Sequence, residues 1–113
     1  MKLTEIQQEF ALNISHLIAY IFASGYKCTL GEALRTREQA CLYADQHKGI
    51  RNSLHCKKLA MDINVFSPSG EYLKDTDEYQ VFGRYWESLN PRNRWGGHFQ
   101  HADGNHFETQ EDL

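Results

Sequence analysis

Three side chains in the second half of the sequence, His55, Asp62 and His106, have the chemistry to share a metal ion. His55 and Asp62 stand at the two ends of a segment that enters a predicted strand, and His106 lies on a separate predicted strand. Asp62 falls on the polar face of its strand, where a carboxylate needs a partner because burying an unpaired charge is costly. Two histidines and one carboxylate, with a fourth position for water, form the ligand set of a catalytic zinc site. From the residues alone, a salt bridge is an equally good partner for Asp62.

The other histidines are weaker candidates for chemistry. His16 lies on the first predicted helix and His47 lies near the end of the second, and both are interpreted as ordinary surface or core residues. His98 and His101 form an H-x-x-H pair, which is an alternative pair of metal ligands.

The elements that position these residues follow from hydrophobic periodicity and from turn signals. Apolar residues recur every three or four positions in the first segment, and residues 59–66 alternate between apolar and polar side chains. The predicted helices are residues 3–24, 36–49 and 77–89, and the predicted strands are residues 26–30, 59–66, 71–73 and 106–108. Residues 67–70 are a predicted turn, and residues 95–97 a tight loop. This order predicts one α+β domain over residues 1–113, with a small sheet covered by helices.

Composition and charge exclude several classes of protein. The chain has 113 residues, of which 41% are hydrophobic and 24% charged, so it is neither disordered nor a fibre or coiled coil. Its net charge of −3 offers no basic excess to neutralise phosphates, so we expect no nucleic-acid partner. The longest apolar run, residues 17–23, is far shorter than the about 20 residues that span a membrane. We therefore expect no stable membrane insertion.

The N-terminus and the cysteines indicate a cellular compartment. The first residues turn polar at once, whereas a signal peptide would place an apolar segment there. The three cysteines are widely spaced and form no C-x-x-C pair, so we expect reduced thiols. Both observations predict a chain that is made in the cytoplasm.

Two sequence motifs carry a resemblance to a known family. Residues 53–62, S-L-H-C-K-K-L-A-M-D, resemble the S-x-H-x-x-G-x-A-x-D motif of the M15 peptidases, and residues 95–108 resemble their W-G-G-x-F-x-x-x-D-x-x-H-F-E motif. A third piece, residues 25–36, is similar to the family's strand and arginine loop. The family comprises zinc D-alanyl-D-alanine carboxypeptidases, D,D-dipeptidases and phage L-alanyl-D-glutamate endopeptidases, and its fold is shared with Hedgehog signalling domains. The compact chain resembles the phage endolysins most.

The resemblance implies a role for each matching residue. His55, Asp62 and His106 would hold Zn²⁺, and Asp103 would be the catalytic carboxylate that moves the proton; its alternative role is to cap the loop before Gly104.

The remaining matching residues would bind substrate or support a ligand. Arg35 would bind a substrate carboxylate, unless it pairs with a nearby glutamate, and Ser53 would contact substrate or orient His55. Glu108, two positions beyond His106 on one strand face, is either a hydrogen-bond partner of that ligand or an edge charge.

One residue departs from the family pattern. Lys58 stands where the motif has glycine, a residue that commonly permits a positive φ. The lysine therefore predicts an ordinary extended backbone at this position.

The function that these features imply is a zinc-dependent peptidoglycan peptidase. We expect an endolysin that hydrolyses the stem peptide at the L-alanyl-D-glutamate bond for host cell lysis, acting as a monomer in the periplasm after a holin opens the membrane. The alternatives are a D,D-carboxypeptidase or dipeptidase on the same fold and a non-catalytic module that zinc only stabilises. Asp103 argues against the module, because a structural site has no use for it. A metal-dependent nuclease is disfavoured by the acidic charge.

Overall fold

The computed structural model describes residues 1–32 and 54–112 of the chain. Helix α1 spans Leu3–Ala23 and helix α3 spans Gln80–Leu89. The strands are β1 (Lys27–Leu30), β2 (Ala60–Phe66), β3 (Asn93–Trp95) and β4 (His106–Thr109). Three short 3-10 helices lie at Leu54–Lys57, Thr76–Tyr79 and Gly96–His98.

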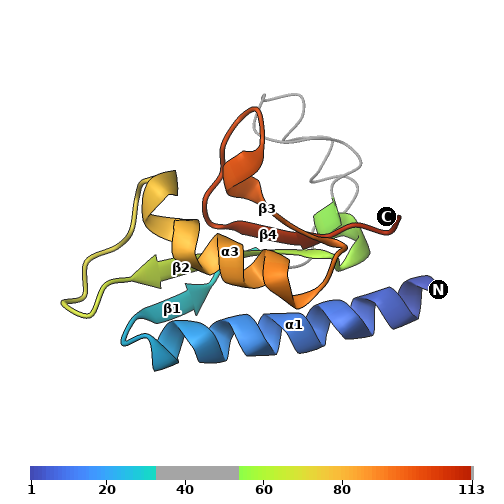
Figure 1. Cartoon of the computed structure of the whole chain (residues 1–113), viewed down its shortest axis with the longest axis horizontal. Coiled ribbons are helices and arrows are strands. Elements are labelled where there is room, and N and C mark those ends of the chain that lie inside the picture. The colour runs from blue at the N-terminus through green and yellow to red at the C-terminus, as the bar shows by residue number, and fades with distance from the viewer. Residues whose placement is uncertain (33–53, 113) are drawn as a thin grey trace.

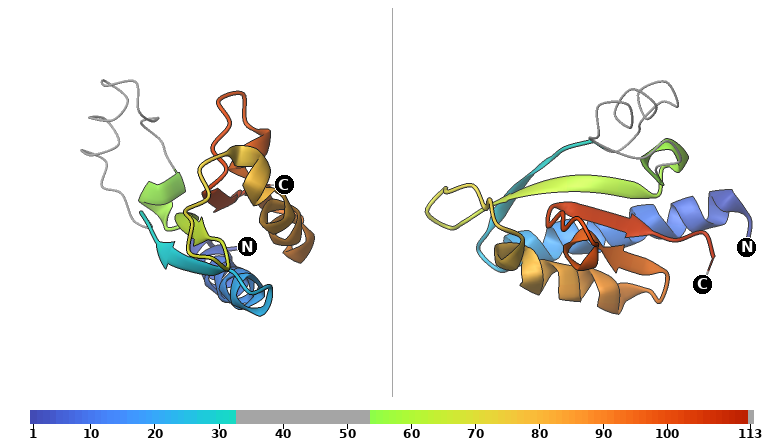
Figure 2. Two further views of the ribbon diagram at one scale, coloured as in Figure 1. Left: turned by 90° about the vertical axis from the view of Figure 1, so that its left-hand side faces the viewer. Right: turned by 90° about the horizontal axis from the view of Figure 1, so that it is seen from above.

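The strands form one antiparallel sheet in the order β1-β2-β4-β3 (Figure 1). Helices α1 and α3 contact each other and lie on the same side of this sheet (Figure 2). The predicted α+β fold, a small antiparallel sheet covered by helices, is therefore confirmed. Neither described helix combines the length with the apolar character that crossing a bilayer requires.

Side-chain periodicity separates the core face of the sheet from the face that neither α1 nor α3 covers, which we call the open face. The apolar stripe of α1 is buried, and on β2 the side chains of Ile63 and Val65 are fully buried between sheet and helices. Asp62 and Asn64 alternate with them and therefore point to the opposite, open face. Aromatic rings complete the core, with Trp86 of α3 packed edge-on against both Phe10 and Phe107.

Several elements differ from the sequence-based prediction. Residues 71–73 form no strand and contribute one isolated bridge, between Phe66 and Tyr72. The helix predicted at 77–89 begins with the 3-10 helix Thr76–Tyr79, at whose start the amide of Asp75 donates a hydrogen bond of 3.1 Å to Oε1 of Glu78. Strand β3 was not predicted, and the loop expected at 95–97 is the end of β3 followed by a 3-10 turn. The helix predicted at 36–49 lies outside the described residues.

Two glycines make room for a buried tryptophan. A Cβ atom on Gly83 would lie 2.1 Å from Cδ2 of Trp95, and one on Gly97 would lie 2.3 Å from Cη2 of the same ring. The indole Nε1 donates a hydrogen bond of 2.7 Å to the carbonyl of Gly104. Trp95 therefore links α3 to the loop that precedes β4.

Gly83→Ala is expected to destabilise the protein by about 3 kcal/mol, because the added methyl group overlaps the Trp95 ring and the packed core cannot yield. This steric effect outweighs the gain of up to about 1 kcal/mol that alanine brings to a helix. Denaturant unfolding measures the difference. The matched control is Arg84→Ala at the adjacent, exposed position, and equal stability of the two variants would contradict the packing argument.

Candidate metal centre

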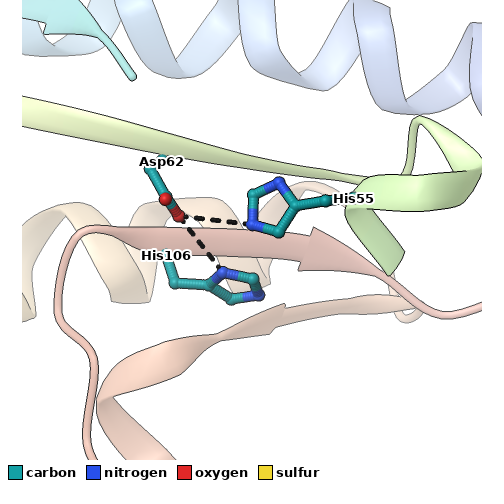
Figure 3. Close-up of side chains that lie close together, drawn as sticks. All are labelled: His55, Asp62 and His106. Atoms are coloured by element: carbon teal, nitrogen blue, oxygen red, sulfur yellow. Dashed lines mark hydrogen bonds and ion pairs between the residues drawn. The ribbon is translucent and has the colours of Figure 1, made fainter. Parts of the chain in front are cut away.

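The three predicted ligands come together on the open face of the sheet (Figure 3). His55 lies in the 3-10 helix Leu54–Lys57 with only 2% of its surface exposed, Asp62 lies on β2 and His106 begins β4. One ligand atom from each residue lies within 4.8 Å of the others. Asp62 and His106 are directly opposite each other in the β2–β4 register, so the sheet itself sets their separation.

The distances from Asp62 to the two histidines fit a tetrahedral zinc ion. Oδ1 of Asp62 lies 3.5 Å from Nε2 of His55 and 3.3 Å from Nδ1 of His106. Two donor atoms that each lie about 2.0–2.1 Å from a tetrahedral ion are about 3.3–3.4 Å apart. Two imidazoles and one carboxylate also match the ligand types of catalytic zinc sites, which leave one position open.

A turn after His55 carries the chain from the first ligand into β2. Lys58 has a φ of 58°, and the turn is closed by a hydrogen bond of 3.0 Å from the amide of Leu59 to the carbonyl of Leu54. The extended backbone predicted for Lys58 is therefore wrong. Lys58 instead adopts the left-handed conformation that glycine adopts easily.

Lys58→Gly is expected to stabilise the protein by about 1 kcal/mol, since the left-handed conformation costs a residue with a Cβ atom roughly 1–2 kcal/mol and glycine loses part of this gain to chain entropy. The free energy of unfolding measures the change. Lys58→Ala is the matched control: it keeps the Cβ atom and should bring no comparable gain. If both variants are equally stable, the backbone at Lys58 is not strained.

Carboxylates surround the two histidines. Nε2 of His106 lies 2.7 Å from Oε1 of Glu108, and Nδ1 of His55 lies 3.9 Å from Oε1 of Glu32. Glu108 is buried, with 5% of its surface exposed, and thus supports His106 as its partner rather than standing as an edge charge. Outer carboxylates of this kind fix the ring orientation of metal-binding histidines.

The same contacts decide the charge states of the site in the absence of metal. Burial opposes ionisation of Asp62, but hydrogen bonds from His106 and His55 outweigh it and lower the pKa of the Asp62 carboxyl to about 2. Burial also opposes protonation of His106, yet hydrogen bonds to Asp62 and Glu108 raise the pKa of its imidazole to about 9. Without metal, the ionised Asp62 therefore contacts a protonated His106, and the positive charge of this imidazole takes the place of the metal cation.

Asp103 lies on the loop before β4, beside the three ligands. Its amide donates to the carbonyl of Gly96 at 2.9 Å, and a Cβ atom on Gly96 would lie 2.3 Å from the carbonyl oxygen of Asp103. Partial burial of the carboxyl group and the charge of Asp62 raise the pKa of Asp103. Asp103 also lines a polar pocket of about 200 Å³, together with Lys74 and Asn105, which none of the three ligands lines. Asp103 thus lies close enough to the candidate metal centre to feel the charges of all three ligands.

The remaining predicted site residues are not part of this group. Arg35 and Ser53 lie outside the described residues. His98 contacts Glu87, with Nε2 3.1 Å from Oε1, and His101 is exposed. Among the described residues, the group able to hold a metal contains neither histidine of the H-x-x-H pair.

Arg94 was missed by the sequence analysis. Its guanidinium contacts Glu108 through Nε at 3.0 Å and Nη2 at 2.6 Å. Only the register of β3 against β4, in which Arg94 stands opposite Glu108, reveals the contact. Because β3 was not predicted as a strand, the available signal was no more than one basic residue next to the W-G-G motif.

Comparisons with known proteins agree with this geometry. The model of an M15 peptidase family, described as D-alanyl-D-alanine carboxypeptidase, matches residues 46–109, which is more than half of the chain. The chain belongs to this family and is an M15-type peptidoglycan peptidase. Its fold is similar to that of the L-Ala D-Glu endopeptidase ChiX of Serratia marcescens, with a TM-score of 0.62 and 20% identity over 74% of this chain and 67% of that chain. None of the curated protein sequences compared with the chain matches it.

Proposed function

We propose that this peptidase is a zinc enzyme that hydrolyses the L-alanyl-D-glutamate bond of peptidoglycan stem peptides. The observation that carries the proposal is the group formed by His55, Asp62 and His106, in which the distances from Asp62 to the two histidines fit zinc. This group lies beside Asp103, and the chain belongs to a peptidase family. The choice of bond is supported by the resemblance to phage endolysins and by the fold that the chain shares with ChiX, which is itself an L-Ala D-Glu endopeptidase.

In this mechanism the chain supplies metal ligands and a proton carrier. His55, Asp62 and His106 would hold the ion, and zinc bound there lowers the pKa of water and polarises a carbonyl group. Asp103 accepts the proton of the attacking water on a carboxylate oxygen and returns it to the leaving amine. Its raised pKa suits both steps, because a base must also be able to act as an acid later in the cycle. Arg35 and Ser53 would bind the carboxylate and backbone of the stem peptide.

The biological role that we propose is host cell lysis by a phage endolysin. The enzyme would be a monomer that is made in the cytoplasm and reaches the cell wall after a holin opens the membrane. Loss of turbidity of outer-membrane-permeabilised Gram-negative cells tests this role, and a chelator should prevent the loss. Cells that stay intact while isolated muropeptides are cleaved would contradict the lytic role and leave the peptidase activity standing.

Mass spectrometry of digested muropeptides tests the bond. Cleavage between L-alanine and D-glutamate leaves the disaccharide with a single alanine, whereas a D,D-carboxypeptidase removes one terminal D-alanine from the pentapeptide. The carboxypeptidase is the second candidate, because the matching family carries that description. Release of D-alanine alone would replace the first proposal with the second, and no cleavage by the zinc-loaded protein would contradict both.

Zinc uptake at pH 7 is expected to release close to one proton from His106. The pKa of about 9 means that this imidazole is protonated at pH 7, and it must become neutral to bind a metal. Calorimetric titration in buffers with different ionisation enthalpies counts the protons released, and His98→Ala, at a histidine outside the group, should release the same number. A binding enthalpy that is independent of the buffer would contradict the expectation.

A further inference from the structure

We infer that Arg94 is a positioning residue for the metal centre, acting on His106 through Glu108. The inference rests on the proposed metal site and adds a residue to it that has no place in the family motifs quoted above. Arg94 contacts Oε2 of Glu108, and the other oxygen, Oε1, contacts Nε2 of His106.

The three residues form one continuous path across the sheet. Arg94 on β3 stands opposite Glu108 on β4, and His106 lies two residues before Glu108 on the same face of β4. On the other side His106 stands opposite Asp62 on β2. Strand pairing therefore aligns a surface guanidinium with the proposed zinc ligands.

Arg94 decides which oxygen of Glu108 is left for the histidine. Nε and Nη2 both donate to Oε2, at 3.0 and 2.6 Å, so the carboxylate is held in one rotation with Oε1 directed at the ring. The Glu108 side chain is almost fully buried, and a buried carboxylate needs such partners because water cannot replace them. Without the guanidinium the carboxylate loses the two donors that fix its rotation.

The orientation of Glu108 in turn decides the tautomer of His106. A carboxylate can only accept, so Nε2 of the ring keeps its proton when zinc binds, and Nδ1, the atom 3.3 Å from Asp62, is the nitrogen left for the metal. The ring is also held by Phe99, whose centroid lies 5.6 Å from that of His106 and 5.4 Å from the Arg94 guanidinium carbon. Arg94 thus contacts Glu108 and Phe99, two of the groups that orient this ligand.

A lysine cannot replace this arginine. The two contacts to Oε2 come from two nitrogens of one planar group, and the same plane lies near the Phe99 ring. An ammonium group offers one point of charge and no plane. Arg94→Lys should therefore have a zinc affinity between that of Arg94→Gln and that of the wild type.

The test measures zinc affinity by competition with a chelator, together with kcat and KM. In Arg94→Gln we expect zinc affinity to fall by about 10–100-fold, as for other outer contacts of metal ligands, while the zinc-free protein still folds. Arg84→Gln, at an exposed position of α3, is the matched control and should bind zinc as the wild type does. The double variant Arg94→Gln, Glu108→Gln should lose little more zinc affinity than Glu108→Gln alone, since Arg94 acts mainly through Glu108.

A second readout uses the zinc-free protein, so that failure of the metal site and failure of this inference can be told apart. NMR of the His106 ring should show a slowly exchanging proton on Nε2 in the wild type and in Arg84→Gln, and a rapidly exchanging one in Arg94→Gln. If the wild type binds no zinc, the proposed metal site is wrong, and the exchange rate of the His106 ring proton still tests whether Arg94 acts on His106 through Glu108. Wild-type zinc affinity and an unchanged ring proton in Arg94→Gln would overturn the inference.

Discussion

In the Asp103→Asn protein, kcat for stem-peptide hydrolysis is expected to fall by roughly 10²–10⁴-fold, while zinc content and melting temperature keep their wild-type values. Asparagine has the size of aspartate and can hydrogen-bond in its place, but its amide accepts no proton near pH 7. Because Asp103 lies beside the three ligands without being one of the group that could hold the metal, loss of its basicity affects the reaction and leaves the site assembled. Muropeptide turnover, zinc analysis and thermal unfolding of one variant measure the three quantities.

The three measurements separate three roles for Asp103. A loop cap would leave turnover nearly unchanged, since asparagine caps about as well as aspartate. A metal ligand would lose zinc together with activity. Asp77→Asn, at an exposed position of the 3-10 helix Thr76–Tyr79, is the matched control and should behave as the wild type. Near-wild-type turnover of Asp103→Asn would exclude the proposed proton transfer.

His106→Ala is expected to lose zinc and activity together, with a fall in zinc affinity of at least about 100-fold. Removal of outer contacts alone costs about 10–100-fold, so removal of a ligand atom costs no less. The substitution also leaves Glu108 facing the gap with Arg94 as its remaining contact described here, which keeps that buried carboxylate paired. The protein should therefore still fold, and metal analysis after dialysis reads the loss of zinc directly.

The control for this experiment is His98→Ala, since His98 contacts Glu87 and lies outside the group that could hold a metal. This variant should keep full zinc and full activity. Full zinc occupancy in His106→Ala would show that His106 is not a ligand, whatever happens to activity.

The strongest predictions from sequence were those that depend on a long pattern. The apolar stripe of α1 and the alternation along β2 extend over enough residues to fix both the element and its buried face. The alternation also predicted that Asp62 lies on the open face of the sheet, and the motifs predicted His55 and His106 as the other two metal ligands. The structure brings all three together.

The predictions that failed depended on short segments or on backbone conformation. Strand β3 has three residues, too few to show a period of two, so neither the strand nor the place of Arg94 beside Glu108 could be read from sequence. Residues 71–73 have a strand-like composition, but they make only one bridge. At Lys58 the residue type predicted an extended backbone. The tight turn between His55 and β2 imposes a positive φ on any residue at this position.

The direct opposition of Asp62 and His106 across β2 and β4 has a consequence for engineering this enzyme. Moving β4 along its neighbours by one position would turn His106 towards the helices and Phe107, now fully buried, towards solvent, and moving β2 by one position would turn Asp62 towards the helices instead. A chain that takes up zinc has therefore also aligned these two strands correctly. In a library of variants with insertions or deletions near β2 or β4, retention of zinc would select the members that are correctly folded, before any assay of cell-wall cleavage is run.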